Sequence, residues 1–300
     1  MNPTATNTGK TRPSYRRAAL AAGLRLAAQW RLLLSWLLVT GLCASLALLP
    51  LKLALGDYLN HSLMADRLLE RLDPAVLAEA LFNLPQRGYS PASALPGLIL
   101  FALCLPWLSG LVQAAARVHV GQLKLGALWL GGWREYPQMA RLWLWTLVPL
   151  GLTGALVSAA LQALDHQAEH WLLASDVSEH RRFIVLAGLV LMLLVQASLD
   201  ATRAQLVLEP GRRSVVKAWG AAVRGCWRQP GRLLLPLLPA LLGLALALVL
   251  AWARTQVAPV NVLGLIGAAL LTLALVTALA WTRAARVMGL VQAGRAGALR

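Results

Sequence analysis

The polar segment near residue 168 holds the residue types best suited to chemistry. His166-Gln-Ala-Glu169-His170 has the H-x-x-E-H spacing of one class of zinc hydrolases. On a helix, two histidines four positions apart share a face, as zinc ligation requires. Asp165 and Glu179 are close by in the sequence. The segment therefore offers a zinc site, with His166, His170 and Glu179 as the candidate ligands.

The surroundings of this motif argue against an enzyme. Residues 165–182 form a short outer loop at the end of an apolar run, with no further domain to form a substrate cleft. The sequence contains no Gly-rich phosphate loop, no Ser/His/Asp set and no Cys-x-x-Cys pair. We therefore expect no catalytic residue and no cofactor. A polar helix end is the main interpretation of the motif, and metal binding stays open as the alternative.

Asp200 is the second residue with chemical potential, because it stands at the inner end of an apolar run. A carboxylate at a membrane boundary can be functional. Arg203 follows three positions later, a spacing that brings two side chains together on a helix. We expect Asp200 and Arg203 to form a structural pair. The middles of the apolar runs contain no Asp, Glu, Lys, Arg or His, which argues against a proton relay or an ion-coupled carrier.

The composition indicates the solvent in which these residues must be positioned. Of the 300 residues, 58% are apolar and only 13% are charged, and the mean hydropathy is +0.63. A soluble domain of this size needs far more charge on its surface. The net charge of +16 lies between long apolar runs and not along one face, so nucleic acid is not an expected partner. The sequence predicts an all-α, polytopic membrane protein.

Six uncharged runs are each about long enough to cross a bilayer. We expect them to form three hairpins, preceded by amphipathic juxtamembrane helices, in one domain spanning residues 18–300 after a disordered basic tail at 1–17. A helical outer segment is expected at 56–94, with a helix start at Asp73-Pro74. Three small-residue pairs, at 41/45, 151/154 and 264/267, offer surfaces for helix packing. The predicted crossings are 32–51, 95–116, 142–164, 183–199, 233–253 and 263–281.

The distribution of basic residues predicts the orientation. Of the 28 Lys and Arg residues, 21 lie before residue 32, in the loops 117–141 and 200–232, and after residue 282. The positive-inside rule then places both termini in the cytoplasm, in a bacterial inner membrane. Cys43, Cys104 and Cys226 are widely spaced and none lies in a predicted outer segment, so a disulfide framework is not expected.

The basic segment before the fifth crossing predicts a helix that lies flat on the inner leaflet. Over 214–228, Lys217, Arg224 and Arg228 fall within about 40° on a helical wheel. Val216, Trp219, Val223 and Cys226 occupy the opposite side. This division would let the apolar side enter the headgroup region, with anionic inner-leaflet lipids as partners. The alternative is an ordinary helix packed on other cytoplasmic segments.

Three short motifs carry a resemblance to known proteins. They are QMARLWLW at 138–145, Asp200-Ala-Thr-Arg203, and DYLNHSL at 57–63. With six crossings, they make the chain similar to a loose group of uncharacterised bacterial inner-membrane proteins. The group includes the membrane domain attached to some glycerophosphodiester phosphodiesterases. The phosphodiesterase domain is absent here, so the resemblance implies a membrane domain and supplies no catalytic residue.

The sequence leads us to expect a non-enzymatic integral membrane subunit that scaffolds partner proteins or binds lipid. The missing catalytic groups and the large basic face support this reading. The first alternative is a transporter or permease component for an apolar or lipid-like substrate, for which proline-containing helices give modest support. The second alternative is a periplasmic zinc-dependent hydrolase, which depends on the motif at 166–170 alone.

Overall fold

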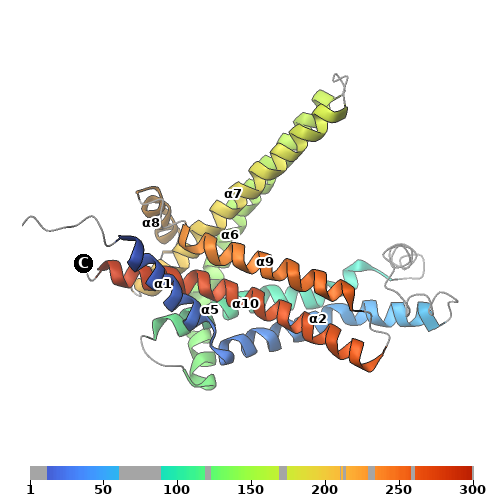
Figure 1. The fold of residues 1–300 in the computed structure, drawn as a ribbon, viewed down its shortest axis with the longest axis horizontal. Coiled ribbons are helices and arrows are strands. Elements are labelled where there is room, and N and C mark those ends of the chain that lie inside the picture. The colour runs from blue at the N-terminus through green and yellow to red at the C-terminus, as the bar shows by residue number, and fades with distance from the viewer. Residues whose placement is uncertain are drawn as a thin grey trace, which may run out of the picture. The chain divides into compact units, whose positions relative to one another are not determined.

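The computed structural model describes residues 12–60, 89–118, 123–168, 174–209, 211, 214–228, 234–257 and 261–298. Within these ranges every regular element is helical (Figure 1), which confirms the all-α class. The short 3-10 helix η2 covers Pro91–Ala94. The α-helices are α1 (Arg12–Ala27), α2 (Trp30–Asn60), α5 (Leu95–Arg117), α6 (Leu125–Ala168), α7 (Ala174–Leu208), α8 (Val215–Arg228), α9 (Leu234–Gln256) and α10 (Val262–Ala298).

Six of the described helices are long and apolar enough to cross a membrane. Each overlaps one predicted crossing, so the polytopic membrane architecture is confirmed. The spans are Trp30–Gly56, Ala92–Arg117, Leu125–His166, Val177–Leu208, Pro236–Gln256 and Val262–Ala296.

Several helices extend well beyond the uncharged runs that predict them. Helix α6 begins at Leu125, so residues 125–141 are helical and not a loop. At 1.5 Å per residue, its 44 residues measure about 66 Å, whereas the hydrocarbon layer is about 30 Å thick. Helix α10 likewise continues to Ala298, through the predicted C-terminal tail. The first charged residues after an uncharged run therefore do not mark where these helices end.

The N-terminal part of the described chain also contains more helix than expected. Helix α1 begins at Arg12, so residues 12–17 of the predicted disordered tail are helical, and residues 1–11 lie outside the description. The helical conformation is interrupted at Ala28 and Gln29, between α1 and α2. The carbonyl of buried Gln29 accepts from the amides of Leu32 and Leu33 at 3.0 and 3.1 Å, which starts α2.

The predicted outer segment is described only at its two ends. Helix α2 runs on to Asn60. At the other end, Ser90 caps η2 by accepting from the amide of Ala92 at 3.3 Å. The expected helix start at Asp73-Pro74 lies outside the described residues.

The chain divides into two compact units. The first contains Met1–Ala27, Gly110–Pro239 and Ala285–Arg300, and the second contains Ala28–Ser109 and Ala240–Ala284. Their boundaries fall inside α5, α9 and α10, so these helices contribute to both units. The expectation of one domain over 18–300 stays a prediction.

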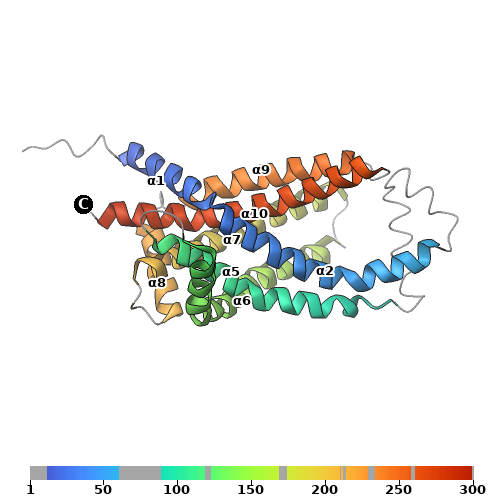
Figure 2. The same ribbon diagram turned by 90° about the horizontal axis from the view of Figure 1, so that it is seen from below.

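In the second unit, two pairs of helices approach closely at glycines. A Cβ added at Gly97 in α5 would collide with the backbone of Ala47 in α2, and one at Gly243 in α9 would collide with Thr282 in α10. Figure 2 shows α9 and α10 running side by side. The missing side chain lets the helices approach this closely. By contrast, nothing lies within 4 Å of a Cβ at Gly41, so its predicted packing surface is not used within the described chain.

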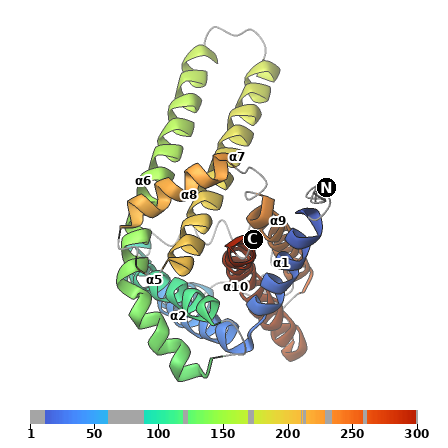
Figure 3. The same cartoon turned by 90° about the vertical axis from the view of Figure 1, so that its left-hand side faces the viewer.

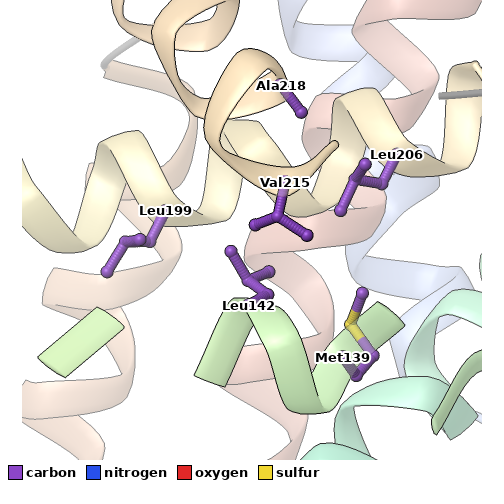
Figure 4. Packing of buried hydrophobic residues seen from close by; sticks show 6 residues of the cluster. All are labelled: Met139, Leu142, Leu199, Leu206, Val215 and Ala218. Atoms are coloured by element: carbon purple, nitrogen blue, oxygen red, sulfur yellow. The ribbon is translucent and has the colours of Figure 1, made fainter. Parts of the chain in front are cut away.

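In the first unit, α6 and α7 form a hairpin and α8 lies across them (Figure 3). A Cβ at Gly188 of α7 would approach Val157 of α6 to 2.6 Å, so these two helices also pack tightly. Six buried side chains join the three helices (Figure 4). They are Met139 and Leu142 of α6, Leu199 and Leu206 of α7, and Val215 and Ala218 of α8. The pairs α2–α5, α6–α7 and α9–α10 are the three predicted hairpins.

Candidate functional site

Asp200 is the centre of a polar site in the first unit. It lies on α7, and its side chain is completely buried. Its Oδ1 accepts a hydrogen bond from Nη1 of Arg203 at 2.5 Å. The structure thus brings together the two residues that the sequence pairs. A desolvated carboxylate requires such a partner, because an unpaired buried charge is strongly unfavourable.

A second arginine reaches the same carboxylate from another helix. Nη1 of Arg286, on α10, lies 3.4 Å from Oδ2 of Asp200. Two guanidinium groups therefore flank one carboxylate, which leaves an excess positive charge at this point. The sequence places Arg286 in a basic tail with no assigned contact. The helical continuation of α10 is what carries it to Asp200.

Helix α5 joins the site through Gln113. This side chain is 1% exposed, and its Nε2 donates to the backbone carbonyl of Arg203 at 3.3 Å. The bond ties α5 to α7 beside the Asp200–Arg203 pair. The Oε1 of Gln113 has no hydrogen-bond partner among the described residues.

One turn further along α5, Arg117 pairs with Glu135 of α6 at 2.8 Å. The two helices can meet here because small residues line the contact. A Cβ at Gly110 would lie 2.7 Å from the carbonyl oxygen of Gly132, and one at Gly131 would lie 2.6 Å from the Cβ of Ala114. The glycines therefore position Arg117 and Glu135 within reach of each other.

Arg295 closes the end of α5. Its Nη2 donates to the carbonyl oxygens of Ala116 and Arg117 at 2.8 and 3.3 Å. The last carbonyls of a helix have no partner within the helix, and a cation is favourable beside them. The final turns of α10 are thus fixed against the end of α5.

We call this set the arginine cluster: Gln113, Arg117, Glu135, Asp200, Arg203, Arg286 and Arg295. It contains four guanidinium groups and two carboxylates. Three of the arginines, Arg117, Arg203 and Arg286, keep a buried Nε that has no hydrogen-bond partner among the described residues. Buried donors are normally satisfied. The cluster therefore has both the charge and the unused donors to bind an anion.

Helix α8 borders the cluster through Trp219. Its indole nitrogen donates to Oγ of Ser198 at 3.1 Å, and its ring meets Trp145 edge-on with centroids 5.7 Å apart. Trp219 therefore packs against α6 and α7 with part of its side chain, and its role at the membrane surface stays a prediction. Val215, Ala218 and Ala222 form the buried side of α8, and Trp219 lies next to that side.

The other residues expected at the membrane surface divide into two groups. Lys217 and Arg224 are exposed on α8, as a surface role requires, but Val216, from the opposite predicted side, is also 49% exposed. The side chains of Cys226 and Arg228 lie outside the description. The membrane-surface role of the basic residues stays a prediction.

The structure leaves the alternative interpretation, a zinc site at the motif 166–170, untested. His166 is exposed near the end of α6, Glu179 is exposed on α7, and His170 lies outside the described residues. Asp165 is engaged by Arg181, with 2.6 Å between the carboxylate and the guanidinium nitrogen. In the part of the chain that is described, no three His, Cys, Asp or Glu side chains gather as a metal site would require.

Sequence reasoning finds the local pair of the cluster and misses its distant members. Gln113 and Arg203 are 90 positions apart, and Arg295 and Ala116 are 179 apart. One sequence contains no signal for such contacts. The sequence does show arginine repeatedly at the basic helix ends, and this repetition is the only signal that these arginines could gather in one place.

No family model, curated protein or solved structure matches the chain. The resemblance to bacterial inner-membrane proteins therefore stays an expectation.

Proposed function

We propose that the chain is a non-enzymatic integral subunit of a bacterial inner membrane that binds anionic lipid and scaffolds partner proteins at its basic side. One observation carries this proposal: the charged groups described as buried or half-buried in the first unit gather in the arginine cluster, at the basic ends of α5, α6, α7 and α10. The uncharged middles of the crossings offer no chain of titratable groups for ion coupling.

The exposed surfaces of the spans fit a lipid environment. Large apolar side chains stand exposed along them, including Leu42 of α2, Leu248 of α9 and Leu263 of α10. In water such a surface is strongly unfavourable, whereas lipid tails solvate it. The exposed apolar side chains thus support membrane integration of these spans.

The basic residues support lipid binding on one side. Lys217 and Arg224 of α8 are exposed. Each cation close to an anionic leaflet is worth about 1 kcal/mol. Together with the excess positive charge of the arginine cluster, they favour an anionic cytoplasmic leaflet, the side to which the positive-inside rule assigns them.

Extraction of the protein from native membranes with a polymer that retains bound lipid tests this function. We expect anionic phospholipid and a stoichiometric protein partner to co-purify with the chain. A stoichiometric ATPase partner would instead support a transporter component. One zinc per chain, lost in the variant His166→Ala/His170→Ala, would support the hydrolase.

A further inference from the structure

We infer that the arginine cluster is a binding site for the headgroup of an anionic phospholipid, with Arg117, Arg203 and Arg286 as the phosphate ligands. The inference rests on the proposed lipid-binding function and assigns it to one site. It goes beyond the flat basic surface of α8, because these three arginines come from three helices, α5, α7 and α10.

The cluster carries an excess of positive charge. The cluster holds the four guanidinium groups of Arg117, Arg203, Arg286 and Arg295 but only the carboxylates of Glu135 and Asp200. Arginine stays protonated at any physiological pH. Two positive charges therefore lack a counter-charge within the cluster, and a partly buried cation without one is unfavourable. An anionic headgroup supplies the missing charge.

Two arginines of the cluster have unused donors on the guanidinium edge away from Asp200. Asp200 engages Nη1 of both Arg203 and Arg286. In a guanidinium group, the Nε–H and one Nη2–H point along the opposite edge. On each of these arginines that edge is turned away from Asp200, and its Nε has no partner among the described residues. Two parallel N–H donors match two oxygens of a phosphate group.

The arginine side chains of the cluster differ in their exposure. The side chains of Arg203, Arg286 and Arg117 are 11%, 20% and 32% exposed. The cluster is thus shielded around Asp200 and opens toward Arg117. Arg117 keeps a further Nε that is itself buried and has no partner among the described residues, and its Nη2 is held by Glu135.

The position of the cluster along the helices favours a lipid over a soluble anion. Arg117 is the last residue of the span Ala92–Arg117, and Arg203 lies five residues before the end of Val177–Leu208. Basic pockets between helices at this depth bind lipid headgroups. On α6, exposed Leu144, Leu147 and Val148 supply the apolar surface that an acyl chain requires.

Native mass spectrometry of the purified full-length protein tests the site. We expect the wild type to retain one phosphatidylglycerol more tightly than phosphatidylcholine with the same acyl chains. The variants Arg286→Gln and Arg117→Gln should each weaken phosphatidylglycerol binding about tenfold, the usual effect of losing a charge-assisted hydrogen bond. Arg286→Lys keeps the charge but loses the forked donors, so it should also weaken binding.

The matched control is Arg182→Gln, which removes one exposed cation at the far end of α7 and should leave binding unchanged. Unfolding midpoints in detergent identify any variant that fails to fold. If Arg286→Gln fails to fold, phosphatidylglycerol binding by Arg286→Lys is the deciding measurement. Equal retention of the two lipids, or unchanged binding in Arg117→Gln/Arg286→Gln, would overturn the site. Displacement of the lipid by millimolar inorganic phosphate would also overturn it, by identifying a site for free anions.

The same samples separate this inference from the proposed function. In one outcome, the double variant Arg117→Gln/Arg286→Gln keeps its partner proteins and retains as much lipid as the wild type. This outcome would rule out the lipid site and would leave the proposed subunit role unaffected. Recovery of an ATPase partner together with selective phosphatidylglycerol retention would remove the non-enzymatic subunit role and leave the site standing.

Discussion

Some contacts of Asp200 can be predicted from the sequence, and others cannot. Its spacing from Arg203 predicts a pair, because residues three apart on a helix are neighbours. Its contact with Arg286 and the approach of Gln113 to Arg203 depend on how separate helices align. That alignment is set by packing at positions such as Gly110, and a single sequence does not encode it in any local pattern. The predictable part of the site was therefore its intrahelical part.

Replacing Asp200 with Asn should destabilise the protein by about 3 kcal/mol, because the change removes one partner of a buried charge pair and leaves two arginines without a carboxylate. Denaturation of the purified protein in mixed micelles with increasing dodecyl sulfate measures this loss. Asp165→Asn is the matched control, since the Asp165 and Arg181 side chains are 57% and 56% exposed and a solvated pair contributes little. Equal losses in the two variants would contradict the buried role of Asp200.

The bond between Trp219 and Ser198 predicts a second effect at single residues. Trp219→Phe keeps an aromatic ring beside Trp145 but removes the indole donor. It should lower the free energy of unfolding by about 1 kcal/mol, the usual value of one hydrogen bond. Ser198→Ala removes the other partner, so the double variant should lose less than the sum of the two single losses. Strict additivity would show that the bond contributes nothing.

Among the elements, the crossings were predictable and their lengths were not. An uncharged run of about twenty residues identifies a helix that can span the hydrocarbon. The same rule predicts that the helix ends at the first charged residues. The backbone hydrogen bonds of a helix, however, can continue beyond the edge of the bilayer. At the end of α10, buried Ala284, Met288 and Val291 show that this continuation packs against protein. The sequence predicts a tail after residue 282 because the apolar positions there are interrupted by arginine.

The pairing of α2 with α5 can be tested with native cysteines. Cys43 of α2 and Cys104 of α5 are both free thiols and lie close enough to influence one another. In the variant Cys226→Ala, a mild membrane-permeant oxidant should therefore join Cys43 to Cys104 within one chain. Intact mass spectrometry should show the loss of two hydrogen atoms and of both alkylation sites. The further variant Cys104→Ser is the control. Two thiols that stay fully alkylatable would contradict the pairing.

The contact between α9 and α10 predicts a steric effect. Gly243→Ala places a methyl group against Thr282, which the two backbones must separate to accommodate. Overpacking of this kind should cost about 1–3 kcal/mol in the free energy of unfolding. Gly41→Ala is the matched control, because nothing lies within 4 Å of its added Cβ. The contact is wrongly described if both substitutions have the same effect in dodecyl sulfate denaturation.

For the whole molecule, the division of basic residues predicts six crossings with both termini in the cytoplasm. Reporter fusions near residues 80, 125, 172, 215 and 300 should report outside, inside, outside, inside and inside. The measurement is paired alkaline phosphatase and green fluorescent protein activity in intact cells. An external signal at residue 215 or 300 would contradict this topology.

The contact of Arg295 with the end of α5 has a consequence for how the protein is made. Arg295 leaves the ribosome 178 residues after Arg117, whose carbonyl it binds. At 5–20 residues per second, this interval is roughly 10 to 40 s. During this interval α5 has been made, but its final carbonyls are not yet bound by Arg295. For part of the same interval Asp200 has been made and Arg286 has not. Emergence of Arg286 and Arg295 from the ribosome is thus the event that finishes the cluster, and a nascent chain that stalls before α10 lacks both contacts.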